Sequence, residues 1–484
     1  MEIIFPVVDI SAVSPQIALV TSAILVLVLG LFDGMRRVIL YIAVGLLAIC
    51  GIVATSAWGG EARAFSDLSA MAVLDDFTIF STLIFIAGGI LTILISVSYA
   101  EHRRIDRGEY YALILFAISG MSLMAASVNL FTFFLSLEVL SISLYVLIGI
   151  EYQKSESNES ALKYFLLGAF ASGFILYGIA LIYGGTGSTD FAAISDQTSG
   201  GSNLLVLAGL GLLLVGIGFK ISMAPFHSWT PDVYQGAPTP ISAFMSTGSK
   251  AAGFAVLVRV FVSVFPQMRP DWVPLLSGLA VLTIAVGNLV ALVQTDLKRL
   301  LAYSSIAHAG YMLLAIVAGG PEGSASILFY LLIYTLMNMA AFGVIAVLSA
   351  KGDTCHGLTD IAGLAKRHPI PAMVMAVAMF SLAGIPPTAG FVAKFYIFTA
   401  LIQTDHITLA IIGVLFSGVS LFYYLRVIVW MYMKDAPISV VTPSVRLSIG
   451  GVAAICVSAL AIIQLGIAPS YLIEMAQQAV SLLQ

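Results

Sequence analysis

"GFKISMAPFHSWTPDVYQGAPTP", residues 218–240, interrupts an apolar run of the chain with a lysine, a histidine, an aspartate and four prolines. The run around it, 203–236, is too long for one crossing of a hydrocarbon core about 30 Å thick, which takes about 20 residues as a helix. Pro225 also lacks the N–H that a continuous helix needs. The stretch therefore predicts two half-helices joined by an unwound segment inside a membrane.

The rest of the chain has the composition of a polytopic membrane protein. Of its 484 residues, 60% are hydrophobic and 10% are charged, which excludes a soluble domain. Apolar runs of helical length recur throughout, so we expect an all-α fold and no β-barrel. About fourteen spans are predicted, at 13–32, 37–58, 76–98, 110–126, 128–150, 160–183, 203–236, 240–264, 273–294, 298–318, 325–349, 371–402, 407–432 and 447–467. The first is expected to be uncleaved, because no lysine or arginine precedes it.

The basic residues between the spans predict the orientation. Fourteen of the 21 lysines and arginines lie in six connecting segments on one side, whereas Arg63, Arg259 and Arg269 lie on the other. Cytoplasmic loops carry the excess of positive charge. The basic side is therefore predicted to be cytoplasmic, with both termini outside.

Four basic residues remain after this count, all within the spans: Lys163, Lys220, Lys250 and Lys394; the acid Glu138 lies within a span as well. Each charge at the centre of a bilayer costs about 3 kcal/mol by insertion scales, so the group as a whole predicts a charge pathway. The alternative is a set of structural ion pairs, or snorkelling in the case of Lys163, which lies near the end of its span.

Polar residues extend these charges along single helix faces. Such stripes predict a hydrated path, although each alone is more often a helix-packing contact. They comprise Ser141 and Tyr145 with Glu138; Thr239, Ser242 and Ser246 with Lys250; Ser304, His308 and Tyr311; and Ser326, Tyr330, Tyr334 and Asn338. His227 and His308 are candidates to bridge between lysines, and the alternative for each is a packed structural histidine.

A second break is predicted in "SLAGIPPTAGFVAKFYIF", residues 381–398, just before Lys394. Broken helices in two halves of a chain indicate inverted repeats. A shift of about 166 residues also lays "SALKYFLL" (160–167) on "SILFYLLI" (326–333). The predicted division is three N-terminal helices (1–108), a first five-helix repeat (109–265), a second, inverted one (266–433), and a C-terminal helix and tail (434–484).

The breaks place Lys220 and Lys394 beside half-helix ends, where backbone groups can hold water or charge. Burial favours a neutral lysine, whereas a nearby Glu138 favours the charged form. Making and breaking this pair would therefore move a proton.

These segments resemble a known family. "GFKISMAPFHSWTPDVYQGAPTPISAFMSTGSKAAGF", "SLEVLSISLYVL", "QTDLKRLLAYSSIAHAGYMLL" and "GIPPTAGFVAKFYIF" are similar to the proton-conducting, antiporter-like subunits of complex I, the proton-pumping NADH:quinone dehydrogenase. The resemblance is strong over about 110–432. The chain is most similar to the subunit N branch, because Lys394 stands where subunit M would carry a glutamate and the long C-terminal extension of subunit L is missing.

The resemblance implies roles for single residues. Glu138 would be the acid paired with Lys220, Lys250 would relay toward Lys394, and Lys163 would modulate the uptake side. It also implies a multi-pass protein of the bacterial inner membrane that contacts lipids, neighbouring subunit M and small membrane subunits, and no nucleic acid. NADH, FMN, iron–sulfur clusters and quinone would belong to partner subunits. The isolated Cys50, Cys355 and Cys456 and the absence of a phosphate-binding loop agree with this chain having no cofactor or metal.

Two other functions stay open. A subunit of a multisubunit cation/proton antiporter would share the broken helices. A passive redox anchor for haem or quinone would want paired membrane histidines, and only His308 lies well inside a regular span.

Overall fold

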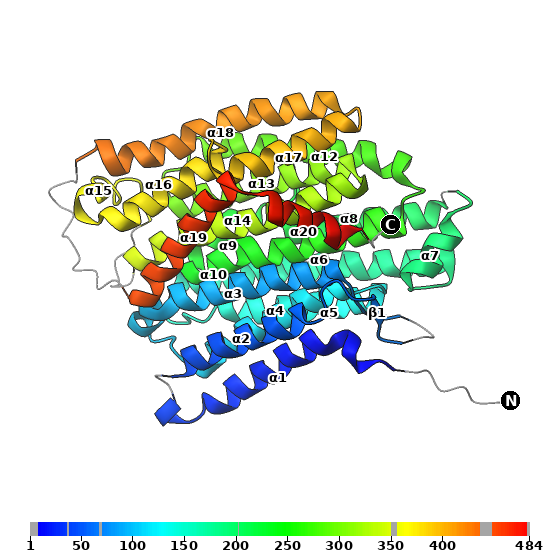
Figure 1. Cartoon of the computed structure of the whole chain (residues 1–484), viewed down its shortest axis with the longest axis horizontal. Helices are drawn as coiled ribbons and strands as arrows, with labels where there is room; N and C mark the ends of the chain where they lie inside the picture. Colours follow the sequence, from blue (N-terminus) through cyan, green and yellow to red (C-terminus); the bar gives the residue numbers. More distant parts are fainter. Residues whose placement is uncertain are drawn as a thin grey trace.

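The computed structural model describes residues 8–35, 38–66, 70–201, 203–349, 356–435 and 448–481, and most of them are helical. Figure 1 shows the helices side by side, with α1 at one edge, α18 at the other, and α19 and α20 across the middle. The elements are η1 (Ile10–Val13), α1 (Ser14–Leu29), η2 (Asp33–Met35), α2 (Ile39–Thr55), β1 (Arg63–Ala64), β2 (Val73–Leu74), α3 (Asp76–Arg103), α4 (Gly108–Ala126), α5 (Leu130–Ile148), α6 (Ser155–Thr186), α7 (Phe191–Thr198), α8 (Leu204–Ile221), α9 (Trp229–Gly236), α10 (Thr239–Phe244), η3 (Met245–Ser249), α11 (Lys250–Leu257), η4 (Val258–Val264), α12 (Arg269–Ala291), α13 (Leu297–Ala318), α14 (Gly320–Leu348), α15 (Leu364–Arg367), α16 (Pro369–Ala383), α17 (Ala389–Gln403), α18 (Ile407–Met433), α19 (Ile449–Ile467) and α20 (Ser470–Val480).

The predicted all-α membrane fold is confirmed. Within the described residues, twelve helices are long and apolar enough to cross a membrane. The two other predicted spans consist of shorter apolar helices, α2 and the pair α16 and α17. Arg103, Lys154 and Lys298 line one cavity at the end of the bundle that also carries α15 (Figure 1), and we call this the basic end. The opposite end carries α7 and the β1–β2 hairpin.

Both predicted helix breaks are present. The helix α8 ends at Ser222, which adopts a left-handed conformation (φ 63°), and α9 begins seven residues later at Trp229. The helix α16 ends at Gly384 (φ 83°), and α17 begins at Ala389 after two prolines. A left-handed residue ends a helix because it turns the chain out of the helical path. Each break therefore leaves carbonyl groups at the end of a half-helix without an N–H partner in the same helix.

Each break is covered by the helix that follows its predicted repeat. The N–H of Ala224 in the first break donates to the hydroxyl of Thr283 in α12, at 3.0 Å. The second break lies against α19, where a Cβ on Gly466 would lie only 2.0 Å from the carbonyl oxygen of Pro387. Glycine is thus required for this close approach. The neighbouring helices shield backbone groups that lipid could not satisfy.

The span at 239–264 contains two π-helical segments, η3 and η4, on either side of α11. Lys250 is the first residue of α11 and is fully buried. Segments of π-helix often occur at functional sites, because the wider turn changes the direction of the side chains around it.

Some features differ from the sequence-based expectation. Arg259 and Lys298 were expected in connecting segments, but both are buried, with 4% and 1% exposure. Each is stabilised by partners: Arg259 pairs with Asp75 at 2.7 Å, and Lys298 donates to two carbonyl groups.

The tail contains the amphipathic helix α20, which packs on α3 and α14. Cys355 lies outside the described residues, and Cys50 and Cys456 are free thiols.

Candidate functional site

Lys220 lines one small cavity, and Glu138 is joined to a wall of this cavity through Ser172. Glu138, half-buried on α5, accepts a hydrogen bond from Ser172 of α6. Lys220, buried near the end of α8, donates to the hydroxyls of Ser141 (3.0 Å) and Tyr164 (3.1 Å). The structure describes both charged residues and shows no ion pair between them, for which nitrogen and oxygen would have to lie within 4.0 Å. The predicted pair is therefore not in direct contact.

The cavity between Ser172 and Lys220 has polar walls. Ser141, Ser172 and Lys220 line it, together with Tyr145 and several small or apolar residues of α5, α6 and α8. The centre of a water molecule can occupy about 10 Å³ of it, which is about the room that one water needs. One hydrated position would thus connect the Ser172 hydroxyl beside Glu138 with Lys220.

Lys250 lies deeper in the bundle, where α11 meets α13. It has no exposed surface, and its Nζ donates to the carbonyl oxygen of Ser305 at 2.8 Å. Ser305 precedes His308 by almost one helical turn on α13. The stem of Lys220 lies near Gly253 of α11, so the two lysines are on adjoining helices. Within the described residues, no chain of hydrogen bonds joins them.

His308 belongs to a cluster of tyrosines between α13, α14 and α18. Its Nδ1 lies 2.6 Å from the hydroxyl of Tyr330, and its Nε2 lies 3.1 Å from the hydroxyl of Tyr424. Tyr424 also shares a short hydrogen bond with Ser304. Both ring nitrogens are therefore engaged, and hydroxyl groups continue the polar path on either side of the imidazole.

Lys394 binds the end of the other half of its own broken helix. Its Nζ donates to the carbonyl oxygens of Leu382 (3.0 Å) and Ala383 (3.1 Å), the last two residues of α16, and to Ser417 Oγ of α18 (2.9 Å). The C-terminal end of a helix carries unpaired carbonyls and a partial negative charge, which stabilise a cation. The break thus provides the site for the lysine that follows it.

Three polar residues connect Lys394 with the histidine cluster. The ring centre of Tyr311 lies 5.1 Å from Lys394 Nζ. Asn288 of α12 donates to the hydroxyl of Tyr311 at 3.4 Å and accepts from the hydroxyl of Tyr423 at 3.1 Å. The ring of Tyr423 packs against that of Tyr424, with 4.4 Å between their centres. From His308 to Lys394 the described residues thus form a nearly continuous polar series.

Lys163 and His227 lie apart from this series. Lys163 is 42% exposed at the basic end and pairs with Glu159 (2.8 Å) and Asp232 (2.9 Å), so it is an ion-paired residue of a polar cavity. His227 is half-buried in the segment between α8 and α9, and its Nδ1 has no hydrogen-bond partner among the described residues. The structure therefore joins neither residue to a buried lysine.

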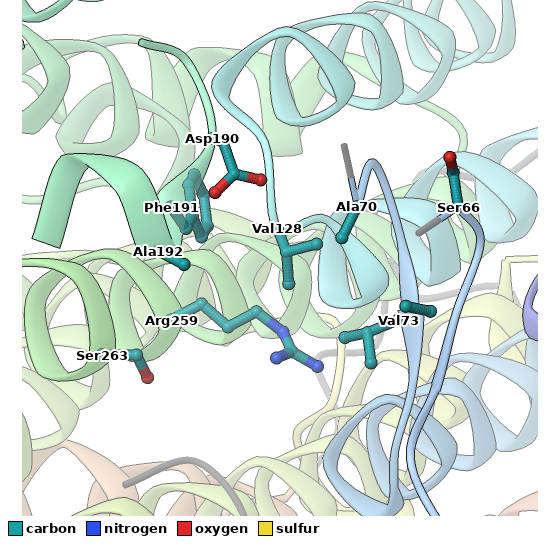
Figure 2. A pocket seen from close by; sticks show the side chains of 10 residues that line it. Ser66, Ala70, Val73, Val128, Asp190, Phe191, Ala192, Arg259 and Ser263 are labelled. Atoms are coloured by element: carbon teal, nitrogen blue, oxygen red, sulfur yellow. The ribbon is translucent and has the colours of Figure 1, made fainter. Parts of the chain in front are cut away.

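A cavity of about 600 Å³ lies at the opposite end, and none of the buried lysines Lys220, Lys250 and Lys394 lines it. Figure 2 shows the side chain of Arg259 extending into it between Ser263 and Val73. The guanidinium group binds Asp75 and the hydroxyl of Thr78. These contacts join η4 to the start of α3, so we assign Arg259 a structural role.

The sequence-based candidates did not include several residues that contact or connect Glu138, the lysines and His308. These are Tyr164, Ser172, Asn288, Ser417, Tyr423 and Tyr424. On α18 the sequence does contain a polar stripe that would have indicated two of them: Ser417, Ser420 and Tyr424 follow one helix face at helical spacing. Asn288 stands alone in an apolar run, so no pattern could have identified it.

Comparisons with known proteins agree with this geometry. A family model described as NADH:quinone oxidoreductase/Mrp antiporter, TM, matches residues 127–420. NADH-quinone oxidoreductase subunit N of Trichlorobacter lovleyi is 47% identical over 489 residues and is covered, like this chain, to 99%.

Two solved structures have the same fold. A chain of respiratory complex I from Thermus thermophilus with bound aureothin is 35% identical, with a TM-score of 0.81 over 96% of this chain and 99% of that one. A chain of the Mrp complex from Dietzia sp. has a TM-score of 0.87 over 97% of both chains at 20% identity, which shows the fold alone. By its sequence and its fold, the chain belongs to the subunit N family of the NADH-quinone oxidoreductases.

Proposed function

We propose that the chain translocates protons through Glu138, Lys220, Lys250 and Lys394 as a membrane subunit of an NADH:quinone oxidoreductase. One observation carries the proposal. The three lysines are buried, with 4%, 0% and 4% exposure, and the hydrogen bonds that the structure gives them go to hydroxyl and carbonyl oxygens. A carboxylate in direct contact would hold a buried lysine in its charged form. Neutral acceptors instead leave the charge of the lysine free to change.

The other candidate residues receive roles that follow from their positions. His308 and its tyrosines would carry a proton between Lys250 and Lys394, since they occupy the space between them. Lys163 would act at the uptake side, in the polar cavity of the basic end. His227 keeps its assignment as a bridge near the first break, and a rearrangement of that break would have to bring it to a lysine.

Cofactors and partners are assigned to the rest of the complex. The relatives are named as subunits of an oxidoreductase, and the described residues hold no group of three or more histidines, cysteines or acids that could bind a metal. We therefore place NADH, FMN, the iron–sulfur clusters and quinone in partner subunits. Subunit M and small membrane subunits are the proposed neighbours.

A vesicle experiment tests the proposal against the two alternatives. In inside-out vesicles that contain the assembled complex, NADH should drive proton uptake that falls when Lys220 is replaced by methionine. A cation/proton antiporter would instead exchange sodium for protons without NADH. A haem anchor would show a haem absorbance band. Haem ligation by His308 is disfavoured, because tyrosine hydroxyls bind both of its ring nitrogens. Sodium exchange without NADH, or NADH-driven uptake unchanged in the variant, would contradict the proposal.

We further propose that the basic end faces the bacterial cytoplasm, that both termini face the periplasm, and that 109–265 and 266–433 are inverted repeats. Single cysteines in a cysteine-free background test the orientation. Lys366→Cys, at an exposed position of the basic end, should react with an impermeant maleimide only in inside-out vesicles. Gln197→Cys, exposed in α7, should react only in intact cells. The reverse pattern would overturn the orientation.

A further inference from the structure

Lys298 is a buried cation that the proposed pathway does not use. It lies in the first turn of α13, is 1% exposed, and forms part of the floor of the cavity of about 530 Å³ at the basic end. The first turn of a helix carries a partial positive charge, so its own helix disfavours a lysine there. Something outside α13 must therefore stabilise the ammonium group.

That partner is the end of the half-helix α9. Lys298 Nζ donates to the carbonyl oxygens of Gln235 (2.8 Å) and Ala237 (2.7 Å). These carbonyls belong to the last turn of α9 and to the residue after it, where no further helical N–H groups follow. A cation from another helix thus caps the C-terminal end of α9, in the position that the helix dipole favours.

Two further cations bind the same short helix. Arg299 donates to Asp232 (2.8 Å) and to the side-chain oxygen of Gln235 (3.1 Å), and Lys163 of α6 pairs with Asp232 from the other side. The helix α9 has only eight residues, too few to be stable alone. Its position is therefore set by these contacts and by its packing.

The start of α9 contacts the partners of Lys220. Trp229 packs on Tyr164, with 4.7 Å between ring centres, and its Nε1 donates to the carbonyl oxygen of Phe219 at 3.0 Å. Tyr164 is a hydrogen-bond acceptor for Lys220. A displacement of α9 along its axis would move Trp229 and with it one of the groups that hold Lys220.

We propose that Lys298 is a positioning residue: it fixes the C-terminal end of α9 and, through Trp229 and Tyr164, the hydrogen-bond partners of Lys220. The consequence for turnover rests on the proposed function, but the consequence for α9 does not. Lys298→Met keeps the length of the side chain and removes the cation, whereas Lys298→Arg keeps a cation that can bind the same carbonyls. Lys366→Met is the matched control, because this lysine at the same end is 76% exposed and pairs with an exposed Asp435.

Two measurements on the assembled complex test the proposal: deuterium uptake of peptides covering 229–236, and NADH-driven proton uptake. Lys298→Met should raise deuterium uptake in that segment and slow proton uptake severalfold. Lys298→Arg should restore most of both, and Lys366→Met should change neither. Unchanged deuterium uptake in Lys298→Met would remove the positioning role, whatever the fate of proton translocation. An arginine variant with normal deuterium uptake but failed proton uptake would also overturn the proposal, since Lys298 would then carry protons itself.

Discussion

Lys394→Ala is expected to slow NADH-driven proton uptake and the coupled electron transfer by at least about tenfold, since a positioned proton-transfer group contributes about 100-fold or more to a rate. Lys394→Arg is expected to fail to a similar degree. An arginine can donate to the carbonyls of Leu382 and Ala383 as the lysine does, but its guanidinium does not release its proton in proteins. The pair of variants therefore separates a group that must titrate from one that only supplies positive charge.

Packing has to be controlled in this experiment. A Cβ on Gly384 would lie 3.0 Å from Lys394 Cδ, so the space around the side chain is tight and a larger group has a packing cost. The amount of assembled complex must therefore be measured with the rates, and Lys366→Arg serves as the control for a lysine-to-arginine change at an exposed site. Normal proton uptake by Lys394→Arg at normal assembly would remove Lys394 from the pathway.

The architecture was predictable because each feature has a local chemical cause. Apolar runs of membrane length set the spans, and the left-handed Gly384 with the prolines after it set the second break. The first break differs in detail. Its left-handed residue is Ser222, which is not a glycine, so the sequence located the break through Pro225 and the excess length of the run, and its boundary was not visible.

The contacts of the buried charges were less predictable, because they depend on how each helix is rotated against its neighbours. Glu138 and Lys220 were expected to pair, since one is the acid of the fifth span and the other the base at the first break, and the family resemblance implies this pair. In the structure Ser141, one turn along α5 from Glu138, faces Lys220, and Glu138 binds Ser172. Lys298 was assigned to a connection because "QTDLKR" is polar as a segment, and sequence cannot show that one residue in such a segment turns inward.

The same arrangement refines the expectation for Glu138. Glu138 binds Ser172, which lines a cavity with room for about one water beside Lys220, so its charge would act on Lys220 across the gap that this cavity leaves and not through a permanent ion pair. Such a gap suits a switch, because a salt bridge that never opens would keep the lysine charged. A change in the position of Glu138 or Lys220 would then decide whether the proton stays or leaves.

Glu138→Gln is expected to lower NADH-driven proton uptake by at least about tenfold, the smaller part of what a proton-transfer group contributes. Glutamine can still accept the hydrogen bond of Ser172 and has the same shape, so the loss would be due to the charge. Glu138→Asp keeps the charge on a side chain that is one methylene shorter, so it should retain part of the rate. Glu109→Gln is the matched control, because this acid in the first turn of α4 is exposed and has no role in the proposed pathway.

The outcome depends on assembly as well as on rate. A loss of assembled complex in Glu138→Gln would indicate that the negative charge of the carboxylate, and not only its role as hydrogen-bond acceptor for Ser172, is needed to hold α5 and α6 together. Normal assembly with slow proton uptake, partly restored by aspartate, is the result that a functional charge requires. If Glu138→Gln assembled and transported protons like the unmodified chain, the pathway would have to begin at Lys220, and the connection from Glu138 through Ser172 and the cavity would have no part in proton transfer.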